Sequence, residues 1–298
     1  MDKFVSVIIP VLNNLEGLCQ TLSALENQTY PSGLYEVIVV DNGSQEDLAG
    51  AIAQFPQVKL TYEPQAGSYH ARNQGISVAQ GEILAFTDSD CLPATDWLTQ
   101  GVAELQAIAD CGLVAGKIEF LFRNPHQPTT VELYDSLTYL DQQRYIQEYH
   151  YGVTANLFTW KSVIERVGNF NGNLKSGGDK EWGNRVYQQG YTLKYSPKVL
   201  IAHPARDSYP ELIRKIVRTR TGGHNLDIMS DLDRGALNRQ RLFKILWRLK
   251  PPLKTIIKKL DACLDSITIP QKVKLISITL WLHYYGLWSD LRFYLGKD

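Results

Sequence analysis

The sequence predicts an α/β protein in which helices flank a mostly parallel sheet, and two patterns lead to this prediction. Apolar runs of strand length recur at Val5–Ile9, Val37–Val40 and Ile83–Thr87. Uninterrupted runs of this kind are typical of parallel strands that are buried on both faces. Amphipathic stretches separate the runs, and the first of them has apolar residues at helical spacing: Leu15, Leu18, Cys19, Leu22 and Leu25. Strands that alternate with helices need crossover connections, which favours parallel pairing.

The remaining elements follow in chain order from the same two patterns. Up to the Ile83–Thr87 strand we expect a helix at Leu48–Phe55, a strand at Val58–Tyr62 and a helix from Ser68 to Ala79. Beyond it we expect a helix to Ala109, a strand at Leu113–Phe122, a strand before Trp160, a helix after Gly178 and a last strand at Val199–His203. The stretch Thr130–His150 has poor periodicity, and we expect a helix or a mobile segment there.

Composition limits the class of protein. The chain has 298 residues, of which 44% are apolar and 21% charged, so it can bury a sizeable core and is not expected to be disordered. Its four cysteines show no CxxC and no zinc-site spacing, which favours reduced thiols. The start of the sequence lacks the features of a signal peptide, and no uncharged apolar run reaches 18 residues. We therefore expect a cytoplasmic protein without a transmembrane helix.

Charge is unevenly distributed although the formal net charge is zero. Residues 1–205 contain 13 Lys and Arg against 22 Asp and Glu, whereas residues 206–298 contain 18 against 9. A basic C-terminal part suggests an anionic partner, and the pattern alone leaves a membrane surface, nucleic acid or a phosphorylated substrate open.

Polar residues gather where the predicted strands end. Pro10, Asp41 and Asp88 each close a strand, and the carboxyl ends of parallel strands are where ligands bind in such sheets. Asp88 and Asp90 are two residues apart, so in an extended chain both carboxylates point to the same side. A divalent cation such as Mg²⁺ or Mn²⁺, which binds one or two carboxylates together with phosphate oxygens, would relieve their repulsion. The alternative for this Asp-x-Asp pair is a polar turn that caps the next helix.

Five short motifs occur in order along residues 4–205, and together they resemble one family. They are Ser6-Val7-Ile8-Ile9-Pro10 with Asn13, Val39-Val40-Asp41-Asn42-Gly43-Ser44, Ala71-Arg72-Asn73-Gln74-Gly75-Ile76, Gly81-Glu82, and Phe86-Thr87-Asp88-Ser89-Asp90. This order and spacing resembles the family 2 glycosyltransferases. The resemblance implies the GT-A fold, with residues 1–206 as a nucleotide-sugar-binding and catalytic domain. Beyond Ser208 the resemblance thins, and we expect residues 207–298 to form a basic helical extension.

The resemblance also implies roles for residues at the nucleotide end. Pro10 and Asn13 would line the nucleotide site, and Asp41 would accept hydrogen bonds from uracil or ribose. Arg72 would hold the diphosphate, for which its forked guanidinium is suited, and Asp88 would contact ribose or a metal-bound water. The alternatives are a turn-capping role for Asp41 and an exposed helix position for Arg72.

Two further residues match the metal position of the family. Asp90 resembles the direct metal ligand, and His203 matches a position that can bind the metal or the diphosphate. Imidazole suits Mn²⁺ better than Mg²⁺. The alternative for His203 is a structural role.

The acceptor side is predicted from the helix that follows Gly178. Asp179 near its N-terminus, where the helix dipole favours an ionised carboxylate, matches the general base of inverting sugar transfer. Many members have Glu-Asp at this point, whereas here Gly178 precedes Asp179, so Glu181 remains an alternative base. Only one of the two can face the sugar, because residues two apart on a helix do not face together. We expect Glu181 and Trp182 on the acceptor wall and Asn156 at a sugar hydroxyl, the alternative for Asn156 being a strand-end hydrogen bond.

These roles together imply an enzyme that moves one sugar from a nucleoside diphosphate sugar, with UDP-sugar favoured, to an acceptor hydroxyl. The acceptor would be a saccharide, a polysaccharide precursor or a lipid-linked sugar, and nucleic acid is not expected as a partner. The QxxRW motif of polymerising relatives is absent, which favours a single transfer. A nucleotidyltransferase and an inactive nucleotide-sugar-binding module remain the alternatives. A dinucleotide-binding oxidoreductase is disfavoured because no GxGxxG follows the first strand.

The C-terminal extension is expected to be helical. Glu211–Arg220 forms a basic amphipathic pattern that runs into a predicted loop at Thr221-Gly222-Gly223-His224, and Arg239–Lys250 repeats the pattern. Residues 251–298 are rich in Trp and Tyr next to lysines, which is typical of a contact with a membrane surface. The alternatives are a helical hairpin packed on the body and a homodimer interface. A membrane contact would bring the protein to the inner face of the plasma membrane.

Overall fold

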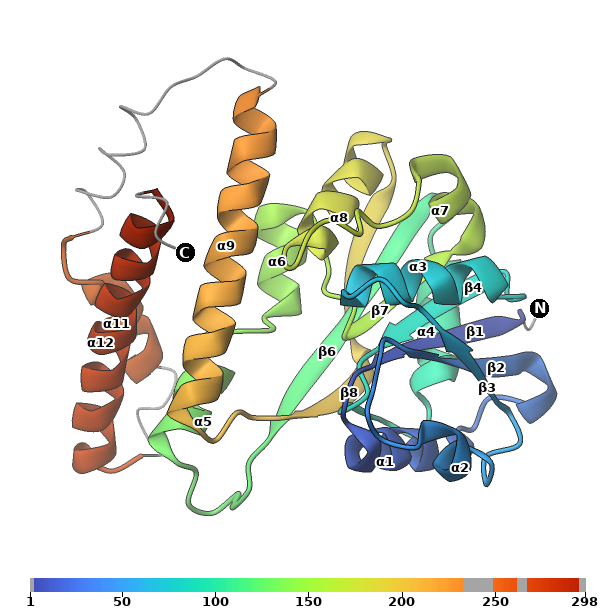
Figure 1. Ribbon diagram of the computed structural model, residues 1–298, viewed down its shortest axis with the longest axis horizontal. Coiled ribbons are helices and arrows are strands. Elements are labelled where there is room, and N and C mark those ends of the chain that lie inside the picture. Colours follow the sequence, from blue (N-terminus) through green and yellow to red (C-terminus); the bar gives the residue numbers. More distant parts are fainter. Residues whose placement is uncertain (1–2, 233–248, 262–266, 295–298) are drawn as a thin grey trace. The chain divides into compact units, whose positions relative to one another are not determined.

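The computed structural model describes residues 3–232, 249–261 and 267–294, and the chain forms two compact units (Figure 1). Unit 1 consists of Met1–Phe120 and Leu140–Pro204, and unit 2 of Leu121–Tyr139 and Ala205–Asp298. The segment 121–139, which the predicted division places in the first domain, therefore groups with the C-terminal part of the chain.

Unit 1 is built on an eight-stranded mixed sheet with the order β3-β2-β1-β4-β7-β6-β8-β5. The strands are β1 (Val5–Val11), β2 (Tyr35–Asp41), β3 (Val58–Tyr62), β4 (Ile83–Thr87), β5 (Leu92–Pro93), β6 (Cys111–Leu121), β7 (Asn156–Trp160) and β8 (Thr192–Pro204). The first four strands pair in parallel, as the alternating pattern predicts, whereas β7 joins β4 and β6 in antiparallel fashion and β5 joins β8 likewise. The α/β class is confirmed.

Helices cover this sheet. They are α1 (Leu15–Glu26), α2 (Leu48–Ile52), α3 (Ser68–Val78), α4 (Trp97–Gln106), α6 (Gln142–Tyr149), α7 (Lys161–Val167) and α8 (Gly178–Gln188), with a 3₁₀ turn at Ser32–Leu34. The apolar stripe of α1 is buried at Leu18, Leu22 and Leu25, as its spacing predicts. In α3, a Cβ on Gly75 would lie 2.5 Å from a methyl carbon of Ile8. Gly75 therefore lets α3 approach β1 closely, which fixes the position of the polar residues that α3 carries.

Unit 2 is helical in its described part. It contains α5 (Thr130–Ser136), α9 (Tyr209–Leu232), α11 (Leu253–Asp261) and α12 (Ile269–Tyr294). Buried residues of α5, α9 and α12 form its core, together with Ile267: Val131, Leu133, Tyr134, Leu212, Ile216, Ile267, Leu275, Ile278 and Leu282.

Buried charges lie beside this core. The fully buried carboxylate of Asp135 accepts hydrogen bonds from Arg206 and lies 3.8 Å from Lys215 Nζ. Asp290, which is also buried, pairs with Arg220.

One expectation for the extension is corrected here. The loop predicted at 221–224 is wrong, because α9 continues through Gly222 and Gly223 to Leu232. A glycine inside a helix costs only about 1 kcal/mol relative to alanine, which the burial of Leu212 and Ile216 outweighs.

The remaining predictions for this part concern Arg239–Lys250 and 251–298. In the second range α11 is short and α12 is one long helix. Residues 239–248, 262–266 and 295–298 lie outside the described residues. Among the helices that the structure describes, none is both long and apolar enough to cross a membrane.

Candidate functional site

Asp88 follows β4 directly and forms an ion pair with a buried arginine of α3. Arg72 Nη2 donates to Asp88 Oδ1 at 2.6 Å, and the Arg72 side chain is 6% exposed. The same guanidinium lies over the ring of Tyr69, one helical turn earlier, at 5.6 Å from the ring centre. Arg72 is therefore not the exposed helix arginine of the alternative interpretation.

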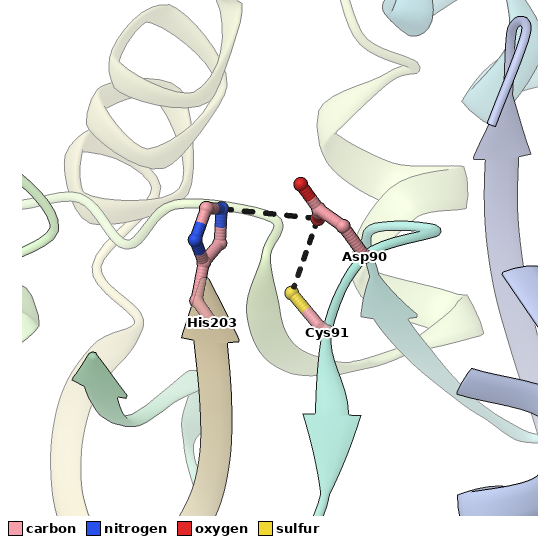
Figure 2. A group of neighbouring side chains, drawn as sticks. All are labelled: Asp90, Cys91 and His203. Carbon is pink, nitrogen blue, oxygen red and sulfur yellow. Dashed lines mark hydrogen bonds and ion pairs between the residues drawn. The ribbon is translucent and has the colours of Figure 1, made fainter. Parts of the chain in front are cut away.

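Asp90 has a different set of neighbours (Figure 2). Its Oδ1 lies 3.8 Å from His203 Nε2 and 3.8 Å from Cys91 Sγ, and one ligand atom from each of the three residues lies within 4.8 Å of the others. Strand pairing produces this arrangement, because Leu92 of β5 lies opposite Ala202 of β8 in an antiparallel register. The residues that flank this pair, Cys91 and His203, are thereby brought together.

This cluster fits a divalent cation. His203 Nδ1 lies 2.7 Å from the carbonyl oxygen of Pro204, which can only accept, so Nδ1 carries the proton and Nε2 presents its lone pair on the Asp90 side. Metal–ligand bonds of about 2.0–2.3 Å place neighbouring ligand atoms roughly 3–4 Å apart, the separation seen between Asp90 and both partners. A set with carboxylate oxygen and imidazole nitrogen suits Mn²⁺ better than Mg²⁺.

Cys91 was not singled out from the sequence, although it directly follows Asp90. Burial raises the pKa of its thiol, and the negative charges of Asp88 and Asp90 raise it further. Without a cation the thiol is therefore neutral and donates to Asp90 Oδ1.

Asp179 lies in the first turn of α8, where the left-handed φ of +83° at Gly177 starts the helix. Thr154 Oγ1 donates to Asp179 Oδ1 at 3.0 Å, and the backbone N–H of Asp179 donates to the Tyr69 hydroxyl at 3.3 Å. Because Gly177 has no capping side chain, Tyr69 caps this helix from α3.

The pKa of Asp179 is raised, mainly by burial. The positive charge of Arg72 and the hydrogen bond from Thr154 oppose this shift, whereas the charge of Asp88 adds to it. A carboxylate with a raised pKa and a fixed orientation is a competent proton acceptor.

At the nucleotide end, Asp41 and Asn13 shape one loop. Asp41 Oδ1 accepts from the backbone N–H groups of Gly43 and Ser44 at 3.2 and 2.8 Å. Asn13, with a left-handed φ of +51°, accepts from the N–H of Gln45. The turn-capping role of Asp41 is thus present in the structure, and it uses only Oδ1. Pro10 is half-buried on β1 opposite Val40.

Two asparagines support these loops and were missed in the sequence. Asn14 Nδ2 donates to the carbonyl oxygen and to Oγ of Ser89 at 3.1 Å, so it holds the residue between the two aspartates. Asn42 binds the backbone of Glu63, Gln65 and Gly67 and fixes the start of α3. Both residues follow a predicted strand, and Asn42 also stands within the motif Val39-Val40-Asp41-Asn42-Gly43-Ser44, but neither received a role.

Three residues expected on the acceptor side have other surroundings. Asn156 is fully buried, where its amide binds the carbonyl oxygens of Lys117 and Val199 and accepts from Trp97. Trp182 is also fully buried, and its indole N–H donates to Gly168. Glu181 forms a two-pronged ion pair with Arg185 at 2.7 and 3.0 Å. The structure does not bring Asn156 or Trp182 to an accessible surface.

Comparison with known proteins finds a matching family and similar glycosyltransferases. The family described as "Glycosyl transferase family 2" matches residues 6–168. Glycosyltransferase AglE of Haloferax volcanii is 40% identical over 260 residues, which cover 84% of this chain and 83% of that protein. A Methanococcus voltae enzyme, dolichyl N-acetyl-alpha-D-glucosaminyl phosphate 3-beta-D-2,3-diacetamido-2,3-dideoxy-beta-D-glucuronosyltransferase, is 22% identical over 82% of this chain and 77% of its own length.

A solved structure shows the same fold. It is the mannosyltransferase PcManGT from Pyrobaculum calidifontis in complex with GDP-Man and Mn²⁺. The match has a TM-score of 0.65 with 21% identity and covers 100% of this chain and 89% of that one. The expected GT-A fold is confirmed. With the family match over more than half of the sequence, this protein belongs to the family 2 glycosyltransferases.

Proposed function

We propose that this glycosyltransferase moves one sugar from a nucleoside diphosphate sugar, UDP-sugar being the favoured donor, to an acceptor hydroxyl with inversion at the anomeric carbon. The observation that carries the proposal is the position of Arg72, which pairs with Asp88 and also acts electrostatically on Asp179. A cationic side chain that can bind the diphosphate therefore acts electrostatically on a carboxylate of raised pKa that can accept the proton of the acceptor hydroxyl.

In this proposal the residues of the chain have separate tasks. Arg72 binds diphosphate oxygens and Asp88 contacts the ribose, while Pro10, Asn13 and Asp41 line the nucleotide end. Asp179 takes the proton from the acceptor hydroxyl as that oxygen attacks the anomeric carbon, and the C–O bond to the diphosphate breaks on the opposite side. Glu181 is the weaker candidate for the base, because Arg185 already holds both of its oxygens.

We propose that Asp90 and His203 hold Mn²⁺ or Mg²⁺ when the donor is bound, and Mn²⁺ in a neighbour of the same fold supports this choice. The cation would offset the negative charge that grows on the leaving diphosphate. Cys91 would then face the same ion through its sulfur.

We propose a lipid-linked sugar as the acceptor, and the name of the Methanococcus voltae relative, a dolichyl phosphate sugar transferase, supports this class. A soluble nucleotide-sugar and a lipid-linked acceptor meet only at a membrane surface. We therefore place the reaction at the cytoplasmic face of the plasma membrane.

A donor panel tests the function. Thermal shifts with UDP-, GDP- and other nucleotide-sugars plus Mn²⁺ identify the donor, and hydrolysis of that donor measures activity without an acceptor. We expect Asp90→Ala and Asp179→Asn to lower turnover by about 10²-fold or more, and the exposed Asp110→Asn to retain it. Wild-type turnover in both site variants would refute the assignment.

Two measurements decide the finer points. Glu181→Gln should keep more activity than Asp179→Asn, and the reverse order would make Glu181 the base. Nuclear magnetic resonance of the product reports its anomeric configuration, and retention would contradict inversion.

A further inference from the structure

Helix α12 of unit 2 has two apolar faces, of which only one is buried. Its inner face, with Leu275, Ile278 and Leu282, belongs to the core with α5 and α9. Its outer face carries large side chains at intervals of three and four residues, which place them on one stripe of the helix: Trp281, Tyr284, Trp288 and Leu291. These four side chains are between 41% and 49% exposed.

The outer residues form a continuous surface with neighbours in unit 2. Tyr209, at the start of α9 and 49% exposed, meets Trp281 edge-on at 6.0 Å between ring centres. Tyr285 links Trp281 to Trp288 through ring contacts of 5.8 and 5.6 Å. We call Tyr209, Trp281, Tyr284, Trp288 and Leu291 the aromatic face. Figure 1 shows α9 and α12 side by side within this unit.

Basic residues accompany the aromatic face. The Arg292 guanidinium lies over the ring of Trp288 at 4.9 Å, and Lys274 is exposed two turns before Trp281 on the same helix. The adjacent α11 exposes Lys254 and Lys258. Asp290 does not offset these charges at the surface, because it is 1% exposed and paired with Arg220.

This combination points to lipid. Trp and Tyr side chains are favoured at the membrane–water interface, and lysines and arginines beside them bind anionic head groups. A cluster of large exposed apolar side chains marks an interaction site. A second copy of the chain is disfavoured, because a two-fold contact through this face would bring the same basic residues of both copies together.

We propose that the aromatic face docks parallel to the surface of an anionic lipid bilayer, with the indole rings at the head-group level. This inference rests on the proposed function, since it supplies the surface on which a lipid-linked acceptor would be presented. In this arrangement the axis of α12 lies in the plane of the membrane surface, and the helix does not enter the bilayer core.

Vesicle sedimentation of the full chain, without donor or metal, tests the proposal. Vesicles of phosphatidylcholine alone are compared with vesicles that contain about one-third phosphatidylglycerol. We expect the wild type to bind the anionic vesicles, and Trp281→Ser with Trp288→Ser to weaken that binding by about tenfold or more. Both positions are half-exposed, so the double variant should fold, which circular dichroism checks. Tyr187→Ser in unit 1, where Tyr187 is also 49% exposed, is the matched control and should bind like the wild type.

Two results with vesicles would overturn the proposal: no binding of the wild type, or equal binding of the wild type and the double variant. A third would be a double variant that loses self-association in sedimentation velocity but binds vesicles like the wild type. The last outcome would assign the aromatic face to a second copy. Donor hydrolysis by the double variant separates this test from the proposed function. It should remain at the wild-type level, whereas loss of hydrolysis in the wild type itself would refute the enzyme and not the docking surface.

Discussion

Arg72 serves two carboxylates with opposite tasks. Its guanidinium pairs with Asp88 at 2.6 Å and lowers the pKa of Asp179, which burial raises. A diphosphate that bound Arg72 would compete with Asp88 for its donors and change the charge near Asp179. Donor binding and the proton affinity of the proposed base are therefore coupled through one side chain.

Replacing Asp179 by Asn should separate stability from activity. Because its pKa is raised, the folded protein holds this proton to higher pH than the unfolded chain does. The free energy of unfolding then falls as pH rises from the unfolded pKa to the folded pKa. Asn cannot ionise, so the variant should unfold at a higher temperature than the wild type at pH 7, by a margin that shrinks as pH is lowered. Its transfer rate should be about 10²–10⁴-fold lower.

The same shift predicts the pH profile of the wild type. The base must be ionised, so the transfer rate should fall as pH drops through the raised pKa of Asp179, above the ordinary range of an aspartate. An Asp179→Asn variant that is less stable than the wild type at every pH would contradict the view that burial of the ionised Asp179 destabilises the fold.

Replacing His203 tests the metal site without turnover. His203→Ala removes the imidazole nitrogen next to Asp90, so Mn²⁺ affinity, measured by electron paramagnetic resonance with the nucleoside diphosphate present, should fall by about tenfold or more. The exposed His126→Ala is the control. Equal affinities in both variants would show that His203 has a structural role.

At the scale of elements, strands and helices with a regular apolar pattern could be predicted from the sequence, whereas contacts between distant segments could not. Three of the four parallel strands, β1, β2 and β4, follow from buried apolar runs, and β3, which is mostly exposed, has the predicted bounds. The contact between Asp90, Cys91 and His203 depends on β5, a strand of two residues, which no local pattern indicates. The Glu181–Arg185 ion pair could be predicted from the sequence, because residues four apart on a helix are neighbours. The burial of Asn156 and Trp182 could not, because it depends on packing between distant segments.

Two glycines of unit 2 should respond in opposite directions to alanine. In α9, a Cβ on Gly223 would meet nothing within 4 Å, so Gly223→Ala should raise the free energy of unfolding by about 0.5–1 kcal/mol. In α12, a Cβ on Gly286 would lie 2.3 Å from the Arg220 guanidinium. Gly286→Ala should therefore push the flexible end of Arg220 aside, strain its ion pair with buried Asp290 and lower the free energy of unfolding by about 1–3 kcal/mol.

Urea denaturation of the full chain measures both substitutions. Destabilisation by Gly223→Ala would indicate that α9 is not helical at this point. A neutral Gly286→Ala would show that Arg220 can keep its ion pair by another path.

At the scale of the whole molecule, unit 2 is discontinuous in sequence. Residues 121–139 supply Val131, Leu133 and Tyr134 to its core, and the other core residues come from beyond residue 205. The predicted boundary at 206 followed the end of the family resemblance and the change in charge. Neither could show this insertion, because its contacts are with residues far along the chain.

Truncation should expose this dependence. A chain that ends after Arg206 loses Lys215 beside Asp135 and the apolar residues that cover α5. It should aggregate or bind a hydrophobic dye, whereas a chain that ends after Pro204 and also replaces 121–139 by a Gly/Ser linker should remain soluble. Size-exclusion chromatography compares the two, and equal behaviour would contradict the role of the insertion.

The ion pair between Asp135 and Arg206 also has a consequence for synthesis. The two residues are 71 positions apart, so at about 5–20 residues per second a ribosome needs roughly 4–14 seconds between them. During that interval Asp135 lacks Arg206, and the insertion has no core to join. The segment around Asp135 should therefore stay hydrated while residues 140–204 are made, and it can join its core only after α9 and α12 have been synthesised.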